Sequence, residues 1–63
     1  MAEFNFYMDA ATKAAKAERA GKYSFAAQLW ESASYSALYK KNRDFAQARS
    51  EFCRKQHEVS AHA

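Results

Sequence analysis

Apolar residues recur along the chain at spacings of three and four, which is the period of an α-helix. This period fills three segments, which we expect to form helices over residues 5–20, 24–40 and 43–57. Gly21 lies between the first two segments, where a glycine readily takes the left-handed conformation that ends a helix. A break at Lys41-Asn42 separates the last two. Since the chain has no proline and only this one glycine, the pattern predicts an all-α fold of three helices.

Each expected helix carries one apolar stripe, which we expect to face the core. The stripes are Phe6, Ala10, Ala14 and Ala17; then Ala26, Leu29, Trp30, Ala33 and Ala37; then Phe45, Ala48, Phe52 and Val59, with Ala46 and Cys53 beside them. The expected N-caps are Asn5, Ser24 and Asn42. Residues 60–63 are expected to fray.

The stretch from Gly21 through Ala26, Trp30 and Ala33 fits the second half of a tetratricopeptide-like helical hairpin. Residues 1–63 form one small domain at most. The apolar fraction of 49% is largely alanine, so large aliphatic side chains are few. A core of this kind gives a chain of this length only about 3–5 kcal/mol of stability. We therefore expect a second copy to complete the core, as a homodimer.

The net charge of +3 lies entirely in the last third of the chain. Residues 1–39 hold four basic and four acidic side chains, whereas residues 40–63 hold six basic and three acidic ones. This segment can attract an acidic partner surface or phosphates. The outward positions of the third expected helix mix both signs, and acidic groups repel phosphates, so direct nucleic acid binding is disfavoured.

Several classes of function lack support in the sequence. Cys53 and His57 are spaced for one helix face but supply at most two metal ligands, and structural zinc takes four. We find no glycine-rich phosphate loop and no catalytic constellation. We therefore expect no enzymatic activity, cofactor or metal. One cysteine, no signal-like start and no membrane-length apolar run lead us to expect a cytoplasmic protein without a membrane segment.

One ordered motif resembles a known family. It reads Glu18-Arg19-x-Gly21-x-Tyr23-x-x-Ala26-Ala27-x-Leu29-Trp30-x-x-Ala33, followed by Asn42-x-x-Phe45-x-x-x-Arg49-x-x-Phe52-Cys53. This pattern resembles the ANR family of small bacterial proteins, which are related to the PerC-like regulators. The resemblance implies a helical negative regulator that binds an AraC/XylS-type transcription activator and blocks its dimerisation or DNA binding. A DNA-binding regulator and a self-assembling helical adaptor are the alternatives.

We expect the partner contacts on aromatic and basic side chains. An apolar groove is expected from Tyr23, Trp30, Phe45 and Phe52, with further contacts from Tyr35, Tyr39, Lys40, Lys41, Arg43 and Arg49. For Trp30, the two tyrosines and the basic run the sequence leaves two interpretations each. Trp30 fits the core or a binding hot spot, Tyr35 and Tyr39 fit a contact surface or packing against the third helix, and the basic run at residues 40–43 fits a solvated junction.

Arg49 also has two interpretations, because it lies inside an apolar stripe. Burial of an unpaired charge costs several kcal/mol, so one possibility is an ion pair with Glu18 or Glu31. The other is a guanidinium directed at a carboxylate of the partner.

Overall fold

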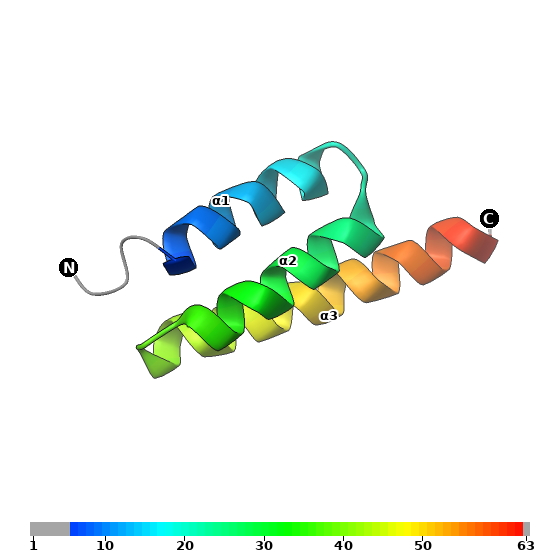
Figure 1. Ribbon diagram of the computed structural model, residues 1–63. Helices are drawn as coiled ribbons and strands as arrows, with labels where there is room; N and C mark the ends of the chain where they lie inside the picture. The colour runs from blue at the N-terminus through cyan, green and yellow to red at the C-terminus, as the bar shows by residue number, and fades with distance from the viewer. Residues whose placement is uncertain (1–5, 63) are drawn as a thin grey trace.

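The computed structural model describes residues 6–62, which form three α-helices (Figure 1). Helix α1 spans Phe6–Arg19, α2 spans Tyr23–Ser36 and α3 spans Lys40–His62. None of these described residues lies in a strand. The prediction of an all-α fold with three helices is confirmed.

Helix α2 is the middle element of the fold. It packs against α1 on one side and α3 on another, whereas α1 and α3 have few direct contacts (Figure 1). The result is an elongated molecule with dimensions of 42 × 18 × 12 Å. Because α2 has 14 residues and α3 has 23, the C-terminal end of α3 extends beyond its neighbour (Figure 1).

The turn between α1 and α2 depends on Gly21, which has a φ of +79°. The Lys22 N–H donates to the Ala17 carbonyl at 2.9 Å, and the Gly21 N–H donates to the Glu18 carbonyl at 3.0 Å. These two bonds form a Schellman motif, which satisfies carbonyls at the end of α1 that have no partner within the helix. The expected role of Gly21 is confirmed.

Small residues line both helix interfaces. The buried residues are Tyr7, Ala14, Ala17, Ala26, Ala27, Trp30, Ala33, Ser34, Ala37, Ala46, Ser50 and Cys53. Between α2 and α3, the Ser50 hydroxyl donates to the Ala27 carbonyl at 3.0 Å. A side chain as short as serine reaches a neighbouring helix backbone only when the two helices lie close together. At this point of contact, such an approach leaves room for alanine, serine and cysteine but not for an aromatic ring.

This close approach overturns the expected core face of α3. Phe45, Phe52 and Val59 are 54%, 41% and 64% exposed, and Ala48 is exposed as well. The buried face instead consists of Ala46, Ser50 and Cys53. At about 100° per residue, this face lies roughly a quarter-turn or more away from the aromatic stripe. In α1 as well, a residue beside the expected stripe is buried in place of one on it: Phe6 is exposed and the neighbouring Tyr7 is buried.

The second break and the helix starts also differ from expectation. Helix α2 ends at Ser36 because Ala37 adopts an extended conformation, so the break lies before Lys40 rather than at Lys41-Asn42. Asn42 therefore lies inside α3, whose first turn closes with an N–H···O bond from Arg43 to Tyr39.

The remaining predictions concern the first and last residues of the helices. Ser24 lies inside α2, which begins at Tyr23 without a side-chain cap. Residues 60–62, which we expected to fray, are helical. Asn5 and Ala63 lie outside the described residues.

We expect Gly21→Ala to lower the free energy of unfolding by about 1–2 kcal/mol. A Cβ at this position meets open space, so the cost arises from the left-handed backbone rather than from a clash. Thermal unfolding followed by circular dichroism measures the change. Lys22→Ala is the matched control in the same turn, and an equal effect of both substitutions would contradict the conformational explanation.

Candidate functional site

The Glu18 carboxylate is the polar centre of the molecule. Its side chain is only 16% exposed, and it forms an ion pair with the Arg49 guanidinium. The Trp30 indole Nε1–H donates to Glu18 Oε1 at 3.0 Å, and the Cys53 Sγ–H donates to the same oxygen at 3.6 Å. One carboxylate on α1 therefore connects to α2 and α3, and we call these four residues the Glu18 hub.

Local structure places each member of the Glu18 hub. Glu18 stands in the last turn of α1, directly before the turn at Gly21. Trp30 lies on the buried face of α2 and is 5% exposed. Arg49 and Cys53 are one helical turn apart on α3, so both reach the same carboxylate. The core interpretation of Trp30 is thereby confirmed.

Arg49 takes one of the two ion-pair partners that the sequence offers. It pairs with Glu18, whereas Glu31 pairs with Arg54 at 3.0 Å. The Arg49 guanidinium also lies over the Phe52 ring, 4.4 Å from its centroid. Its charge is therefore balanced within the molecule, and the guanidinium lies within cation–π distance of an aromatic side chain. A direct contact between Arg49 and a partner stays a prediction.

Four side chains were expected to line an apolar groove, and two of them, Trp30 and Phe45, are in contact in the structure. The Trp30 and Phe45 rings meet edge to face, with centroids 5.6 Å apart. Phe52 lies two turns further along α3, and Tyr23 is partly buried against the core. Because Trp30 is buried, it supports this surface from below, and Phe45 and Phe52 form its exposed part.

Phe45, Phe52 and Val59 follow one another at intervals of seven residues along α3. We call these three exposed residues the α3 seam. Tyr35, Leu38 and Tyr39 form a second exposed apolar group at the end of α2, with Tyr35 and Tyr39 79% and 58% exposed. Phe6, Met8 and Phe25 are exposed as well. Apolar side chains that gather on a surface are typical of contact sites, so these groups are candidate contact surfaces.

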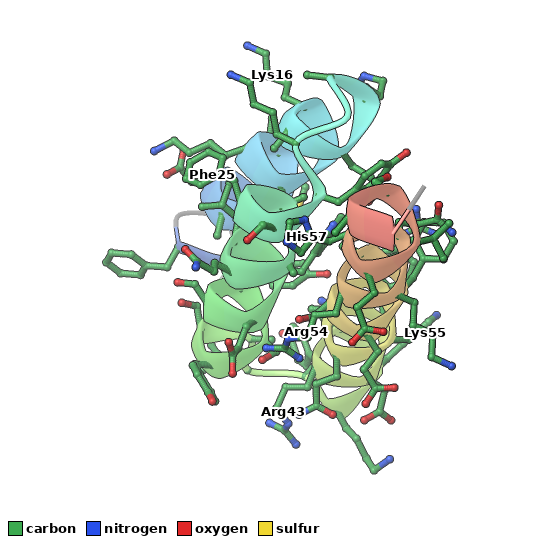
Figure 2. All side chains as sticks on the ribbon, turned by 90° about the vertical axis from the view of Figure 1, so that its right-hand side faces the viewer. Lys16, Phe25, Arg43, Arg54, Lys55 and His57 are labelled. Carbon is green, nitrogen blue, oxygen red and sulfur yellow. The ribbon has the colours of Figure 1, made fainter. Side chains whose placement is uncertain are left out.

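The basic residues of α3 divide into paired and outward-facing ones. Lys40 pairs with Asp44 at 2.7 Å, Arg49 with Glu18, and Arg54 with Glu31. Lys41, Arg43 and Lys55 are exposed. Figure 2 shows Lys55 pointing away from α2, whereas Arg54 and His57 point towards it. The basic run at residues 40–43 is thus a solvent-exposed helix start, and its role in partner binding stays a prediction.

Two shallow hollows lie along the junction of α2 and α3. Their volumes are about 220 and 370 Å³, and the Glu31–Arg54 ion pair contributes to both. Sequence reasoning did not single out these hollows, because no local pattern pairs residues that are 23 positions apart. Among residues 6–62, no group of three or more His, Cys, Asp or Glu side chains could hold a metal ion.

Cys53 is a buried free thiol. Burial raises the pKa of the Cys53 thiol, and the nearby Arg49 guanidinium offsets part of this rise. The folded state therefore favours the protonated thiol, which donates a hydrogen bond to Glu18. A protonated, enclosed thiol is a poor nucleophile, so the position is suited to packing rather than to chemistry.

We expect Glu18→Ala to lower the free energy of unfolding by about 2–3 kcal/mol, because it leaves three donors without their acceptor. Glu18→Gln keeps an oxygen for the Trp30 indole and should cost less. Urea denaturation followed by Trp30 fluorescence measures both. Glu31→Ala is the control, since it breaks a more exposed ion pair worth at most about 1 kcal/mol. A loss from Glu18→Ala no larger than that of the control would contradict the central role of the Glu18 hub.

We expect the stability of the protein to fall with rising pH through the range in which Cys53 titrates. A raised pKa in the folded state means that this contribution is fully present below the pKa of the unfolded thiol and is lost as the pH passes the folded value. Free energies of unfolding between about pH 8 and 10 should therefore fall more steeply for the native chain than for Cys53→Ser. The serine keeps a donor but does not titrate, so identical slopes would count against the burial effect.

No helix within residues 6–62 has the length and apolar character needed to cross a membrane. No family model, curated protein or solved structure matches the chain. Function is therefore inferred from the α3 seam, the Glu18 hub and the distribution of charge.

Proposed function

We propose that this protein is a negative regulator of transcription that binds an AraC/XylS-type activator and blocks its dimerisation or its binding to DNA. The α3 seam is the observation that carries the proposal. Phe45, Phe52 and Val59 are exposed along one helix, although burying them would stabilise the fold. A helical segment of another protein could cover this line of apolar side chains.

The positions that carry the ANR resemblance support the same proposal. All four members of the Glu18 hub belong to that motif, and so does Gly21, which forms the first turn. The motif therefore coincides with the residues that hold the three helices together. Phe45 and Phe52, which belong to the motif as well, stand on the exposed side of this arrangement.

Inhibition by this surface requires binding alone. If a helix of the activator docks on the α3 seam, that helix is unavailable for pairing with a second activator molecule. Docking could also hold the DNA-binding domains of the activator apart. Since activators of this class work at promoters, the proposal places the protein in the bacterial cytoplasm. It also requires no catalytic group and no cofactor.

Direct DNA binding is the less favoured alternative. Three of the six basic residues of α3 already pair with carboxylates of the same chain. Asp44, Glu51 and Glu58 lie on the same helix and repel phosphates. Self-assembly into a homodimer is the second candidate, and the exposed group of Tyr35, Leu38 and Tyr39 is the observation that favours it.

A mobility-shift assay tests the proposal with a purified AraC/XylS-type activator from the same genome and its promoter DNA. We expect the native protein to abolish the activator–DNA complex at a stoichiometric amount, without shifting the DNA by itself. Phe45→Ser should weaken this inhibition by about tenfold or more, because a central apolar contact is worth about 1.4 kcal/mol or more.

Phe25→Ser is the matched control for this assay. Phe25 is 54% exposed, as is Phe45, but it lies on α2 and projects away from α3 (Figure 2). Equal losses from both variants would contradict a role of the α3 seam. A specific shift of the DNA without activator would instead indicate a DNA-binding regulator. Sedimentation of the protein alone as a dimer, without any effect on the activator, would favour the self-assembling adaptor.

A further inference from the structure

We propose that the partner segment of the α3 seam is an acidic amphipathic α-helix. This inference rests on the proposed function for the statement that the α3 seam binds protein. It goes further by naming the chemistry of the segment: apolar residues on one helix face, with Asp or Glu along both sides of that face.

The spacing of the α3 seam fits a helix rather than an extended strand. Phe45, Phe52 and Val59 are seven residues apart, so they lie almost on one line along α3. From the first to the last they span about 21 Å, at 1.5 Å per residue. The exposed Ala48 lies beside this line and leaves room for an apolar side chain of the partner. A partner helix of about four turns matches this length.

The charged positions nearest to the α3 seam are all basic. At about 100° per residue, Lys41, Arg49 and Lys55 lie within roughly 60° of the line of the seam. The three acidic residues of α3, Asp44, Glu51 and Glu58, lie at roughly 80° or more. Asp44 is moreover paired with Lys40. Lys41 and Lys55 therefore make the border of the seam positive towards its two ends, whereas the Arg49 charge between them is balanced by Glu18.

Charged residues of the neighbouring helices do not reverse the positive charge at the border of the α3 seam. The α1 carboxylate that reaches α3 is Glu18, and Arg49 balances its charge. Lys41 and Lys55 are exposed and remain the dominant charges on the border of the α3 seam. Figure 2 shows Lys55 on the side of α3 away from α2, where a docked helix could reach it.

The C-terminal end of α3 offers free access to such a partner. None of residues 54–61 of α3 is buried, and the helix extends beyond α2 (Figure 1). Val59 and Lys55 lie on this part. A partner helix can therefore contact the last turns of α3 without displacing α1 or α2.

A second copy of the chain fits the α3 seam less well than an acidic helix. Parallel pairing of two seams would bring the two Lys55 side chains together. Antiparallel pairing centred on Phe52 would bring Lys55 of one copy close to Arg49 of the other. Two unbalanced lysine charges meet in the parallel direction, which opposes self-pairing there, whereas in the antiparallel direction the Arg49 charge is already balanced by Glu18.

Two synthetic helical peptides test the proposal. Both carry leucine at the same heptad positions, and the flanking positions are all glutamate in one and all lysine in the other. We expect the native protein to bind the acidic peptide about tenfold or more tightly in fluorescence anisotropy, with a preference that shrinks as salt is added. Equal binding of both peptides, or of neither, would overturn the proposal.

Charge-reversal variants show whether the preference for the acidic peptide comes from the lysines beside the α3 seam or from the net charge of the protein. The double variant Lys41→Glu with Lys55→Glu should prefer the basic peptide. The double variant Lys16→Glu with Lys22→Glu has the same net charge, but its substitutions lie on α1 and in the first turn, so it should keep the acidic preference. Circular dichroism checks that both remain folded. Reversal of the preference in both double variants would overturn the local assignment.

The same variants separate this inference from the proposed function. If the Lys41→Glu with Lys55→Glu variant inhibits the activator as well as the native protein does, the acidic-helix inference is wrong and the proposed function stands. If the acidic peptide binds at the α3 seam but the protein neither binds nor inhibits the activator, the proposed function is wrong and the inference stands. Loss of a sedimenting dimer in Val59→Ser would assign the seam to a second copy and overturn the inference.

Discussion

The packing of this protein depends on the single carboxylate of Glu18. Helices α1 and α3 have few direct contacts, so each could shift separately against α2. Glu18 opposes this by accepting hydrogen bonds from Trp30 on α2 and Cys53 on α3 while pairing with Arg49. A carboxylate that is only 16% exposed needs such partners, because an unpaired buried charge is costly. The requirement to satisfy this charge therefore fixes the relative positions of all three helices.

Close packing of small residues determines what remains on the surface. Alanine, serine and cysteine fill the interfaces, and the Ser50–Ala27 bond shows how near the α3 side chains come to the α2 backbone. Trp30 and Tyr7 are the large side chains that the core encloses. The large apolar residues of α3 have no space inside the core, so they form the exposed α3 seam. The same packing that builds the fold thus produces the surface on which the functional proposal rests.

The Glu18 hub and the α3 seam are physically continuous. Arg49 pairs with Glu18 on one side and lies over the Phe52 ring on the other. Phe45 contacts the Trp30 ring, which donates to the same carboxylate. The exposed rings are therefore held by groups that are themselves fixed in the core. A partner would meet a preorganised surface, which lowers the entropy lost on binding.

The sequence alone determined the features that depend on local backbone preference and on strong apolar periodicity. The helical period and the absence of proline predicted three helices, Gly21 predicted the first turn, and alanine neighbours predicted the burial of Trp30. The second break was misplaced, because no glycine or proline marks it and Ala37 is extended only in its tertiary setting.

Tertiary structure decided which face of α3 is buried and which carboxylate pairs with Arg49. Hydrophobicity favoured the face with Phe45 and Phe52, but the distance between two backbones selected the face with Ala46 and Ser50. Glu18 and Glu31 were equivalent in the sequence, and only the packing of the helices brought Glu18 to Arg49 and Glu31 to Arg54. Space between helices is a property of the assembled fold, so no local pattern along the chain could specify it.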